Sequence, residues 1–223
     1  MARVIAIDGP SGSGKSSTSR RVGRALGFLH VDSGALYRIM TWQCLAQGVE
    51  TSDPAAVAAC AERVQVECRP ENGALAYYVD GEAPGARIRT PEINAHASLV
   101  ATVKAVRDRI TALLRGMTRY GDLVVEGRDI TTVVFPDSPA RFYLTASPEA
   151  RARRRQLEEV ATGVANQSAE AVKASLLARD AIDSTRAYAP LRKADGVLEI
   201  DSTQLTLDQV VETVLDALPA GWR

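Results

Sequence analysis

The sequence is poor in the residues that build metal centres and disulfide frameworks. It contains three cysteines and two histidines in 223 residues. An odd number of cysteines without C-x-x-C spacing favours neither a disulfide framework nor a zinc site, so we interpret Cys44, Cys60 and Cys68 as reduced thiols. His30 and His96 have no partner at metal-ligand spacing, which favours structural roles for both.

Excess charge and long hydrophobic runs are lacking too. The sequence has 27 basic residues (lysine and arginine) and 27 acidic residues (aspartate and glutamate), so the formal net charge is zero. That balance argues against a general binder of nucleic acid or membrane surfaces. No apolar stretch approaches the length that spans a bilayer, and the apolar run after Arg3 is too short for a signal peptide. We therefore expect a cytoplasmic monomer whose partners are small molecules.

What the sequence does contain is an alternation of short apolar runs and helical patterns. The runs cover residues 4–7, 28–31, 123–125, 140–144 and 197–200. Such alternation is typical of an α/β fold, a three-layer parallel sheet with helices on both faces. Ligands of these folds bind beyond the carboxyl ends of the strands. With 46% hydrophobic residues in 223, a single domain is expected.

One segment breaks this alternation. Residues 64–68, 74–79 and 82–89 resemble small strands, separated by turn residues that include Asp80-Gly81. We interpret the segment as a small antiparallel insert. An irregular loop is the alternative, and it is disfavoured by Tyr77 and Tyr78 beside the turn, since aromatic residues favour strands.

A glycine-rich turn follows the first apolar run. It reads Gly9-Pro10-Ser11-Gly12-Ser13-Gly14-Lys15-Ser16, and a helix is predicted directly after it over residues 17–26. The spacing G-x-x-x-x-G-K-[ST] lets backbone N–H groups surround phosphate oxygens, while Lys15 adds positive charge and Ser16 can bind magnesium. A chance match is disfavoured by the strand before the motif and the helix after it. The motif, hereafter the P-loop, predicts a nucleoside triphosphate site.

Two polar segments follow other apolar runs. Asp32-Ser33-Gly34-Ala35-Leu36-Tyr37-Arg38 opens a predicted helix, with Ser33 expected at the capping position and Arg38 one turn inside. Converging hydroxyl, N–H and guanidinium groups make an anion site, although alone the pattern indicates a capped helix with a solvated arginine. After the third run, Glu126 is the candidate acid for the hydration shell of magnesium. Arg128 is expected to point into the cleft rather than pair with Asp129.

Two later helical segments are rich in arginine. Arg151, Arg154 and Arg155 lie near one another on a predicted helix that leads into Ala161-Thr162-Gly163, a candidate hinge for a lid. A solvated basic face or a nucleic-acid surface is the alternative. Farther along, Arg179, Asp183 and Arg186 share one helical face, where an intrahelical salt-bridge ladder is the alternative reading.

These segments together resemble one family, the bacterial cytidylate kinases within the nucleoside monophosphate kinases. The resemblance covers residues 5 to about 216. It rests on five ordered motifs: the P-loop with Ile7 and Asp8, the segment 32–38, Glu126-Gly127-Arg128-Asp129-Ile130 with residues 133–137, the segment 151–157, and the segment 179–191. Two positions depart from the family pattern: Thr131 replaces an expected glycine, and Ser17 follows Ser16. The choice between Ser16 and Ser17 as metal-side hydroxyl therefore stays open.

The resemblance implies that the γ-phosphoryl group of ATP passes to CMP or dCMP with magnesium. It also implies one kinase domain in three parts: a core (residues 1–63, 91–150 and 186–223), an insert in the monophosphate-binding region (about 64–90) and an arginine-rich helical lid (about 151–185). Carried over by position, the implied ATP-binding residues are Gly9, Pro10, Ser11, Gly12, Ser13, Gly14, Lys15, Ser16 and Ser17, with Ser16 beside the metal.

The resemblance also assigns the acceptor side. The acceptor phosphate is implied to meet Ser33, Arg38, Arg128 and Arg186. Cytosine is implied to meet Ser98, Arg107 and Asp129, and the sugar to meet Tyr37, Arg179 and Asp183. The implied catalytic groups are Lys15, Arg128, Arg151, Arg154 and Arg155.

Two other function classes stay open at this point. A P-loop kinase for UMP, AMP or a non-nucleotide such as shikimate shares the triphosphate site. A GTP-dependent switch is disfavoured because the sequence has neither Asp-x-x-Gly after the P-loop nor Asn-Lys-x-Asp.

Overall fold

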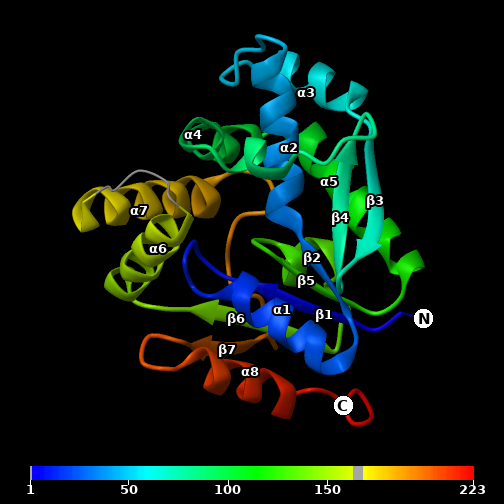
Figure 1. The fold of residues 1–223 in the computed structure, drawn as a ribbon, viewed down its shortest axis with the longest axis vertical. Helices are drawn as coiled ribbons and strands as arrows, with labels where there is room; N and C mark the ends of the chain where they lie inside the picture. The colour runs from blue at the N-terminus through cyan, green and yellow to red at the C-terminus, as the bar shows by residue number, and fades with distance from the viewer. Residues whose placement is uncertain (1, 163–167) are drawn as a thin grey trace.

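The centre of the molecule is a seven-stranded sheet in the order β3-β4-β2-β5-β1-β6-β7 (Figure 1). This computed structural model describes residues 2–162 and 168–223. Neighbouring strands run parallel, except in the hairpin of β3 and β4 at one edge. The strands are β1 (Val4–Asp8), β2 (Leu29–Asp32), β3 (Val66–Glu71), β4 (Ala74–Val79), β5 (Leu123–Gly127), β6 (Ala140–Thr145) and β7 (Leu198–Asp201).

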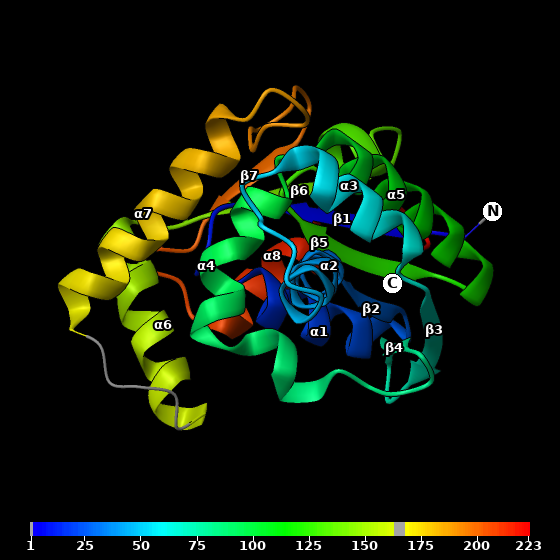
Figure 2. The ribbon, with the colours of Figure 1, turned by 90° about the horizontal axis from the view of Figure 1, so that it is seen from above.

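Helices cover both faces of the sheet. They are α1 (Lys15–Leu26), α2 (Ser33–Ala46), α3 (Pro54–Arg63), α4 (Pro91–Val100), α5 (Lys104–Gly116), α6 (Pro148–Thr162), α7 (Ala169–Thr185) and α8 (Leu207–Asp216). The described elements are completed by two short 3₁₀ helices, η1 (Gly85–Arg89) and η2 (Met117–Tyr120), and a short π-helix, η3 (Ile130–Val134). Helices α6 and α7 lie together at the end of the molecule opposite the β3–β4 hairpin (Figure 2).

Alternation along the strands produces two hydrophobic cores. Ala6 and Val125 face the core that α2, α3 and α5 cover, whereas Ile7, Val124 and Phe142 face the core that α1 and α8 cover. β1 and β5 are buried along their whole length, and their side chains are apolar on both faces except for Asp8 and Glu126 near the carboxyl ends. The predicted three-layer α/β fold is confirmed, and each of the five predicted core runs overlaps a strand.

The insert is a hairpin that joins the main sheet. Asn72 and Gly73, at φ 49° and 76°, form its tight turn. The expected third strand over residues 82–89 is wrong: only a single bridge joins Val79 to Glu82, and η1 then begins. Pro84 has no N–H to donate to a ladder, and β4 already lies between β3 and β2.

No helix in the described part of the chain combines the length and the apolar character needed to cross a bilayer. The predicted arginine-bearing segments are helices α6 and α7, whereas Gly163 of the candidate hinge lies outside the described residues. The division into core, insert and lid stays a prediction.

Close approach between α1 and β2 gives the first testable prediction. A Cβ at Gly23 would lie 2.9 Å from the carbonyl oxygen of Phe28, the residue directly before β2. Although alanine favours helix by about 1 kcal/mol over glycine, we expect Gly23→Ala to lower the free energy of unfolding by about 1–3 kcal/mol because the helix must move off the strand. Denaturant unfolding measures the change.

Gly116 provides the matched control. It ends α5 with φ −64°, and a Cβ there would meet nothing within 4 Å. Gly116→Ala should therefore leave stability unchanged or raise it by up to about 1 kcal/mol. Equal stability of the two variants would contradict the packing argument.

Candidate active site

A cavity of about 890 Å³ opens beyond the carboxyl ends of β2 and β5, beside the P-loop. Most of the residues predicted for the site line it. They are Ser11, Gly12, Gly14, Lys15, Ser16, Ser17, Ser33, Tyr37, Arg38, Ser98, Arg107, Arg128, Asp129, Arg155, Arg179, Asp183 and Arg186. The predicted residues outside this lining are Gly9, Pro10, Ser13, Arg151 and Arg154.

The P-loop is held by contacts that only glycine permits. A Cβ at Gly9 would lie 1.9 Å from the carbonyl oxygen of Leu144, and one at Gly12 would lie 3.0 Å from the carbonyl oxygen of Arg151. The loop then enters α1 at Gly14, where no side chain caps the helix and the first turn has no acidic residue. The N–H groups of that turn are therefore available for an anion.

Lys15 lies inside the loop. Its Nζ donates to the carbonyl oxygen of Pro10 at 2.7 Å, and the residue is 6% exposed. Burial, followed by the positive charge of Arg128, lowers the pKa of Lys15 to about 7. A bound phosphate would restore the charged form, because it supplies the opposite charge that this amine lacks.

Arginines crowd the cavity opposite the P-loop. Arg128 donates to Ser11 Oγ at 2.6 Å and to Asp183 Oδ2 at 3.0 Å, so it does not pair with Asp129. Burial and the charge of Arg128, with a smaller contribution from Arg38, lower the pKa of Arg179 to about 10. Guanidinium groups gathered at one place, one of them with a lowered pKa, form an anion site.

The start of α2 differs from the prediction. Asp32 caps the helix by accepting from the N–H of Ala35 at 3.0 Å, so the expectation that Ser33 is the cap is wrong. Ser33 instead donates its hydroxyl to the carbonyl oxygen of Glu126 at 2.7 Å, because the parallel pairing of β2 and β5 brings their ends together. Arg38 donates to Asp32 at 2.8 Å.

Asp32 is held as an anion. Burial by itself would raise its pKa, but the guanidinium groups of Arg38 and Arg89 outweigh burial and lower the pKa to about 2. Ser33 and Arg38 thus both line the cavity, as predicted. Asp32, which directly precedes Ser33, holds Arg38 there through an ion pair.

A buried ion pair forms another wall. Arg107 Nη2 donates to Asp129 Oδ2 at 2.5 Å and Nη1 donates to the carbonyl oxygen of Ala101 at 3.0 Å. The guanidinium carbon lies 5.2 Å from the ring centre of Tyr37. Arg107 Nε is buried and has no hydrogen-bond partner within the described residues. Ser98, on α4, lines the same cavity.

Helix α7 supplies a third wall. Asp183 accepts from Arg128 through Oδ2 and from Arg186 Nη1 at 3.2 Å through Oδ1. Arg186 also donates to the carbonyl oxygen of Ala189. Arg179, Asp183 and Arg186 all line the cavity. The predicted shared helical face holds for Arg179 and Asp183 of α7, whereas Arg186 follows the helix in an extended conformation.

The arginines of α6 are divided between two places. Arg155 lines the cavity, whereas Arg151 donates to the carbonyl oxygen of Ser11 at 3.0 Å and pairs with Asp180. Arg154 donates to Ser202 Oγ at 2.9 Å. Arg151 and Arg154 therefore anchor α6 to the P-loop side, and their role at a transferring phosphate stays a prediction.

Sequence reasoning missed two acidic anchors. Asp8, at the end of β1, accepts from Ile130 N at 2.9 Å and from Thr131 N and Oγ1 at 2.7 and 2.6 Å. Burial raises the pKa of Asp8 to about 6. Asp180 accepts from the N–H of Ser11 at 3.0 Å. Their signals in the sequence are an acid directly before the P-loop and one beside Arg179, neither of which indicates a partner.

Further members of the cavity wall were also missed. Those with polar or charged side chains are Arg20, Asp32, Arg89, Thr90, Asn94 and Glu158. Arg89 belongs to the segment expected to be a strand, so its position depends on η1.

The oxygen groups of the cavity fit magnesium. Ser16 and Glu126 line it, with Ser17 as a second hydroxyl, while Asp8 lies outside the lining and is committed to three hydrogen bonds. Among the described residues no group of three or more histidine, cysteine, aspartate or glutamate side chains could hold a metal. Sparse protein ligation suits Mg²⁺, which keeps several waters and binds substrate phosphates.

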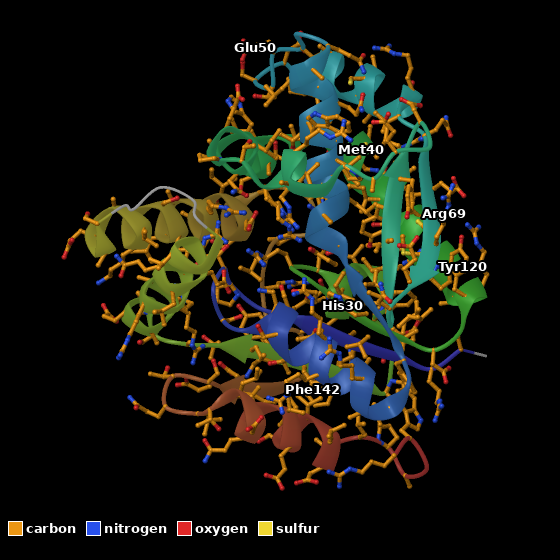
Figure 3. The ribbon with its side chains drawn as sticks, viewed as in Figure 1. His30, Met40, Glu50, Arg69, Tyr120 and Phe142 are labelled. Carbon is orange, nitrogen blue, oxygen red and sulfur yellow. The ribbon has the colours of Figure 1, made fainter. Side chains whose placement is uncertain are left out.

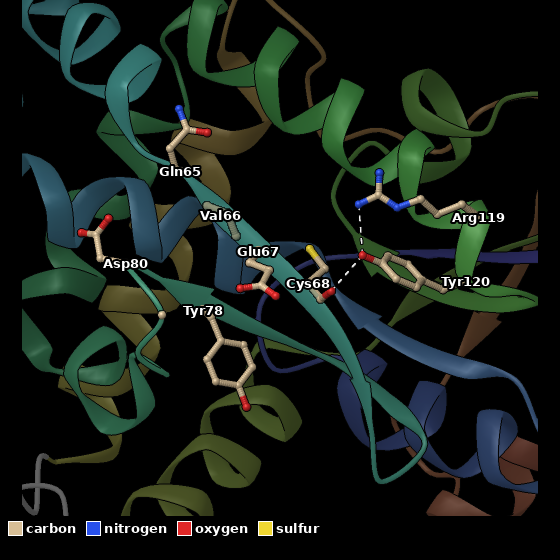
Figure 4. A pocket seen from close by; sticks show the side chains of 9 residues that line it. Gln65, Val66, Glu67, Cys68, Tyr78, Asp80, Arg119 and Tyr120 are labelled. Atoms are coloured by element: carbon tan, nitrogen blue, oxygen red, sulfur yellow. Dashed lines mark hydrogen bonds between the residues drawn. The ribbon is translucent and has the colours of Figure 1, made fainter.

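A second hollow of about 370 Å³ lies over β3, between Tyr78 and Tyr120 (Figure 4). Tyr120 donates its hydroxyl to the carbonyl oxygen of Cys68 at 2.8 Å and accepts from Arg119. None of the predicted site residues lines this hollow.

Comparison with known proteins decides the family. A sequence model described as cytidylate kinase matches residues 5–220. The chain belongs to the cytidylate kinase family. Among its relatives, the cytidylate kinase of Streptomyces avermitilis is 46% identical over 216 residues, with 96% of this chain and 91% of the relative covered. That of Shouchella clausii is 41% identical over 212 residues, with 95% and 94% covered.

Solved structures support the fold alone. The structure of an uncharacterized protein from Eubacterium ventriosum matches with a TM-score of 0.51 at 10% identity, and 96% of each chain is covered. Membership of the cytidylate kinase family makes this protein an enzyme, a nucleoside monophosphate kinase, and a GTP-dependent switch is not supported.

The pKa of Lys15 gives the second prediction. In the free protein, Lys15 loses its proton as pH rises through about 7, and a bound polyphosphate holds the proton on. Binding of ATP should therefore take up close to one proton at pH 8.5 and far less at pH 6, and affinity should fall by up to about tenfold per pH unit above 7. Titration calorimetry in buffers of different ionisation enthalpy measures the uptake.

Lys15→Arg is the matched control. Arginine keeps its charge throughout this range, so its uptake at pH 8.5 should be smaller by about one proton. Phosphate groups of ATP titrate identically in both experiments and cancel. Equal proton uptake by the parent and Lys15→Arg would contradict the assignment of this proton to Lys15.

Proposed function

We propose that this enzyme transfers the γ-phosphoryl group of ATP to CMP or dCMP, giving ADP and CDP or dCDP. The observation that carries the proposal is one cavity with three walls: the P-loop, the arginines around Arg128, and the buried pair of Arg107 and Asp129. Each wall suits one part of the two substrates. The arginines serve both substrates, because the phosphates of ATP and of the acceptor both need positive charge.

The pair of Arg107 and Asp129 suits cytosine. Cytosine presents an amino donor beside ring acceptors, which matches an anionic carboxylate beside a guanidinium. Uracil presents a carbonyl oxygen where cytosine has the amino group, and a carboxylate repels it. Discrimination then follows because a buried acceptor would stay unpaired.

Transfer is direct and in line. An ionised oxygen of the monophosphate attacks the γ-phosphorus, and the bond to the β-phosphate oxygen breaks, with ADP as leaving group. That oxygen is already ionised near neutral pH, so no general base is required. Catalysis consists of positioning and electrostatic stabilisation.

This chain's residues divide the task. Backbone N–H groups of the P-loop and Lys15 hold the triphosphate, while Ser33, Arg38 and Arg128 hold the acceptor phosphate. Arg155 neutralises negative charge on the phosphoryl group during its transfer. Ser16 and Glu126 would hold magnesium, which supplies charge neutralisation across the β- and γ-phosphates. A cytoplasmic location and a monomeric state stay predictions from the sequence.

The third prediction concerns the acceptor. With ATP and magnesium, ADP release should be fastest with CMP or dCMP, and kcat/KM for UMP should be lower by at least about tenfold, the worth of one buried hydrogen bond to a charged group. A coupled ADP assay with each monophosphate offered separately measures this. Preference for AMP, UMP or shikimate would establish a different P-loop kinase.

The fourth prediction concerns Asp129. Asp129→Asn should lower kcat/KM for CMP by about 10- to 100-fold, because the variant loses the anionic acceptor. For the same reason, the ratio of kcat/KM for CMP to kcat/KM for UMP should fall. Asp108→Asn, an exposed change on α5 next to Arg107 in sequence, is the control and should leave the ratio unchanged. An unaltered ratio in Asp129→Asn would remove this residue from base recognition.

A further inference from the structure

His30 and Glu126 form a buried pair at the floor of the cavity. His30 lies in β2 and Glu126 lies near the end of β5, and they are 4% and 5% exposed. Nε2 of the imidazole is 3.3 Å from Glu126 Oε1. Figure 3 shows His30 in the interior of the molecule, near β2. The histidine lies outside the lining of the cavity, whereas the glutamate belongs to it.

Glu126 differs from the other acids that line the cavity. Each of the others pairs with arginine: Asp32 with Arg38, Asp129 with Arg107, Glu158 with Arg155, and Asp183 with Arg128 and Arg186. Within the described residues, His30 is the one hydrogen-bond partner of the Glu126 carboxylate. Arginine cancels the charge of a carboxylate, so Glu126 is the lining acid without a permanent cation at hydrogen-bond distance.

The chemistry of the pair fixes a tautomer. A carboxylate only accepts hydrogen bonds, so Nε2 of His30 carries the hydrogen. The hydrogen bond from Nε2 fixes the orientation of Oε1. No described residue donates to Oε2, which is left for a ligand. A carboxylate this buried needs at least one such bond, because desolvation of an unpaired charge is costly.

We propose that His30 is a positioning residue: its Nε2–H group orients the carboxylate of Glu126 toward a divalent cation. The inference rests on the proposed function, since the cation accompanies the nucleotide. It goes beyond the structural role that the sequence favoured for His30. Partners of this kind, beyond the ligand itself, change metal affinity by about 10- to 100-fold when removed.

Imidazole NMR tests the tautomer in the ligand-free protein. The sequence has two histidines, so long-range ¹H–¹⁵N spectra contain two ring systems, and His96→Gln assigns them. His30 should show a protonated Nε2. A bare Nε2 would overturn the inference.

Binding of Mn²⁺ to the protein–ADP complex, followed by electron paramagnetic resonance, tests the consequence. His30→Leu should weaken Mn²⁺ binding about tenfold, whereas His30→Gln, whose amide retains an N–H donor, should stay within about threefold of the parent. KM for CMP should stay unchanged while kcat falls in His30→Leu. Thermal unfolding shows whether each variant is folded, and His96→Gln is the control.

A double-mutant cycle separates positioning from general structural damage. Because His30 acts through Glu126, His30→Leu should add no further loss of Mn²⁺ affinity in a Glu126→Gln background. Additive losses, or equal losses in His30→Leu and His30→Gln, would overturn the inference while the proposed function stands. A parent enzyme that binds Mn²⁺ no more tightly with ADP than without it would overturn both.

Discussion

Buried positive charge, held in place by buried carboxylates, is the constraint on which the site depends. A guanidinium in a cavity loses hydration, and several together repel one another, as the lowered pKa of Arg179 records. Asp183 offsets this by binding both Arg128 and Arg186. The carboxylates therefore keep the arginines at fixed positions, and a phosphate adds the negative charge that is still missing. Positions fixed before the substrate arrives reduce the reorganisation needed during transfer.

The sheet determines where this charge can gather. Parallel strands β1, β2 and β5 end at one edge, so the loops after them share one space. Asp8 connects two of these loops, because its carboxylate at the end of β1 binds Ile130 and Thr131 in the loop after β5. The hydroxyl of Thr131 completes that connection. Thr131, which stands where the family pattern has glycine, thus makes a side-chain hydrogen bond to Asp8 that glycine cannot make.

Local sequence patterns were sufficient for the strands of the main sheet, whereas most site residues were carried over from the family resemblance and their roles stay predictions. Apolar runs and the P-loop spacing depend on neighbours in the chain, and they predicted the strands and the start of α1 closely. The third strand of the insert failed because its formation depended on a free edge of β4. Ser33 was expected as a cap because it is a favoured capping residue, but Asp32 precedes it and the carbonyl of Glu126 competes for its hydroxyl.

Pairings between distant segments could not be predicted. Nothing in the sequence indicates the partners of Asp180 and His30, because Ser11 and Glu126 are 169 and 96 positions away. A position in the chain shows what a side chain can donate or accept, whereas its partner depends on how the strands and helices pack. Resemblance to a family names the residues that meet substrate, yet it does not name those that hold them.

The contacts of Ser11 link the donor and acceptor halves of the site. Its N–H donates to Asp180 of α7, its carbonyl accepts from Arg151 of α6, and its hydroxyl accepts from Arg128. A shift of α6 or α7 relative to the P-loop must therefore break bonds to the triphosphate-binding loop, and Arg128 is displaced with them. The same set of bonds therefore fixes the P-loop and Arg128 relative to each other, and the proposed in-line reaction requires such a fixed relation between the groups that would bind its two nucleotides.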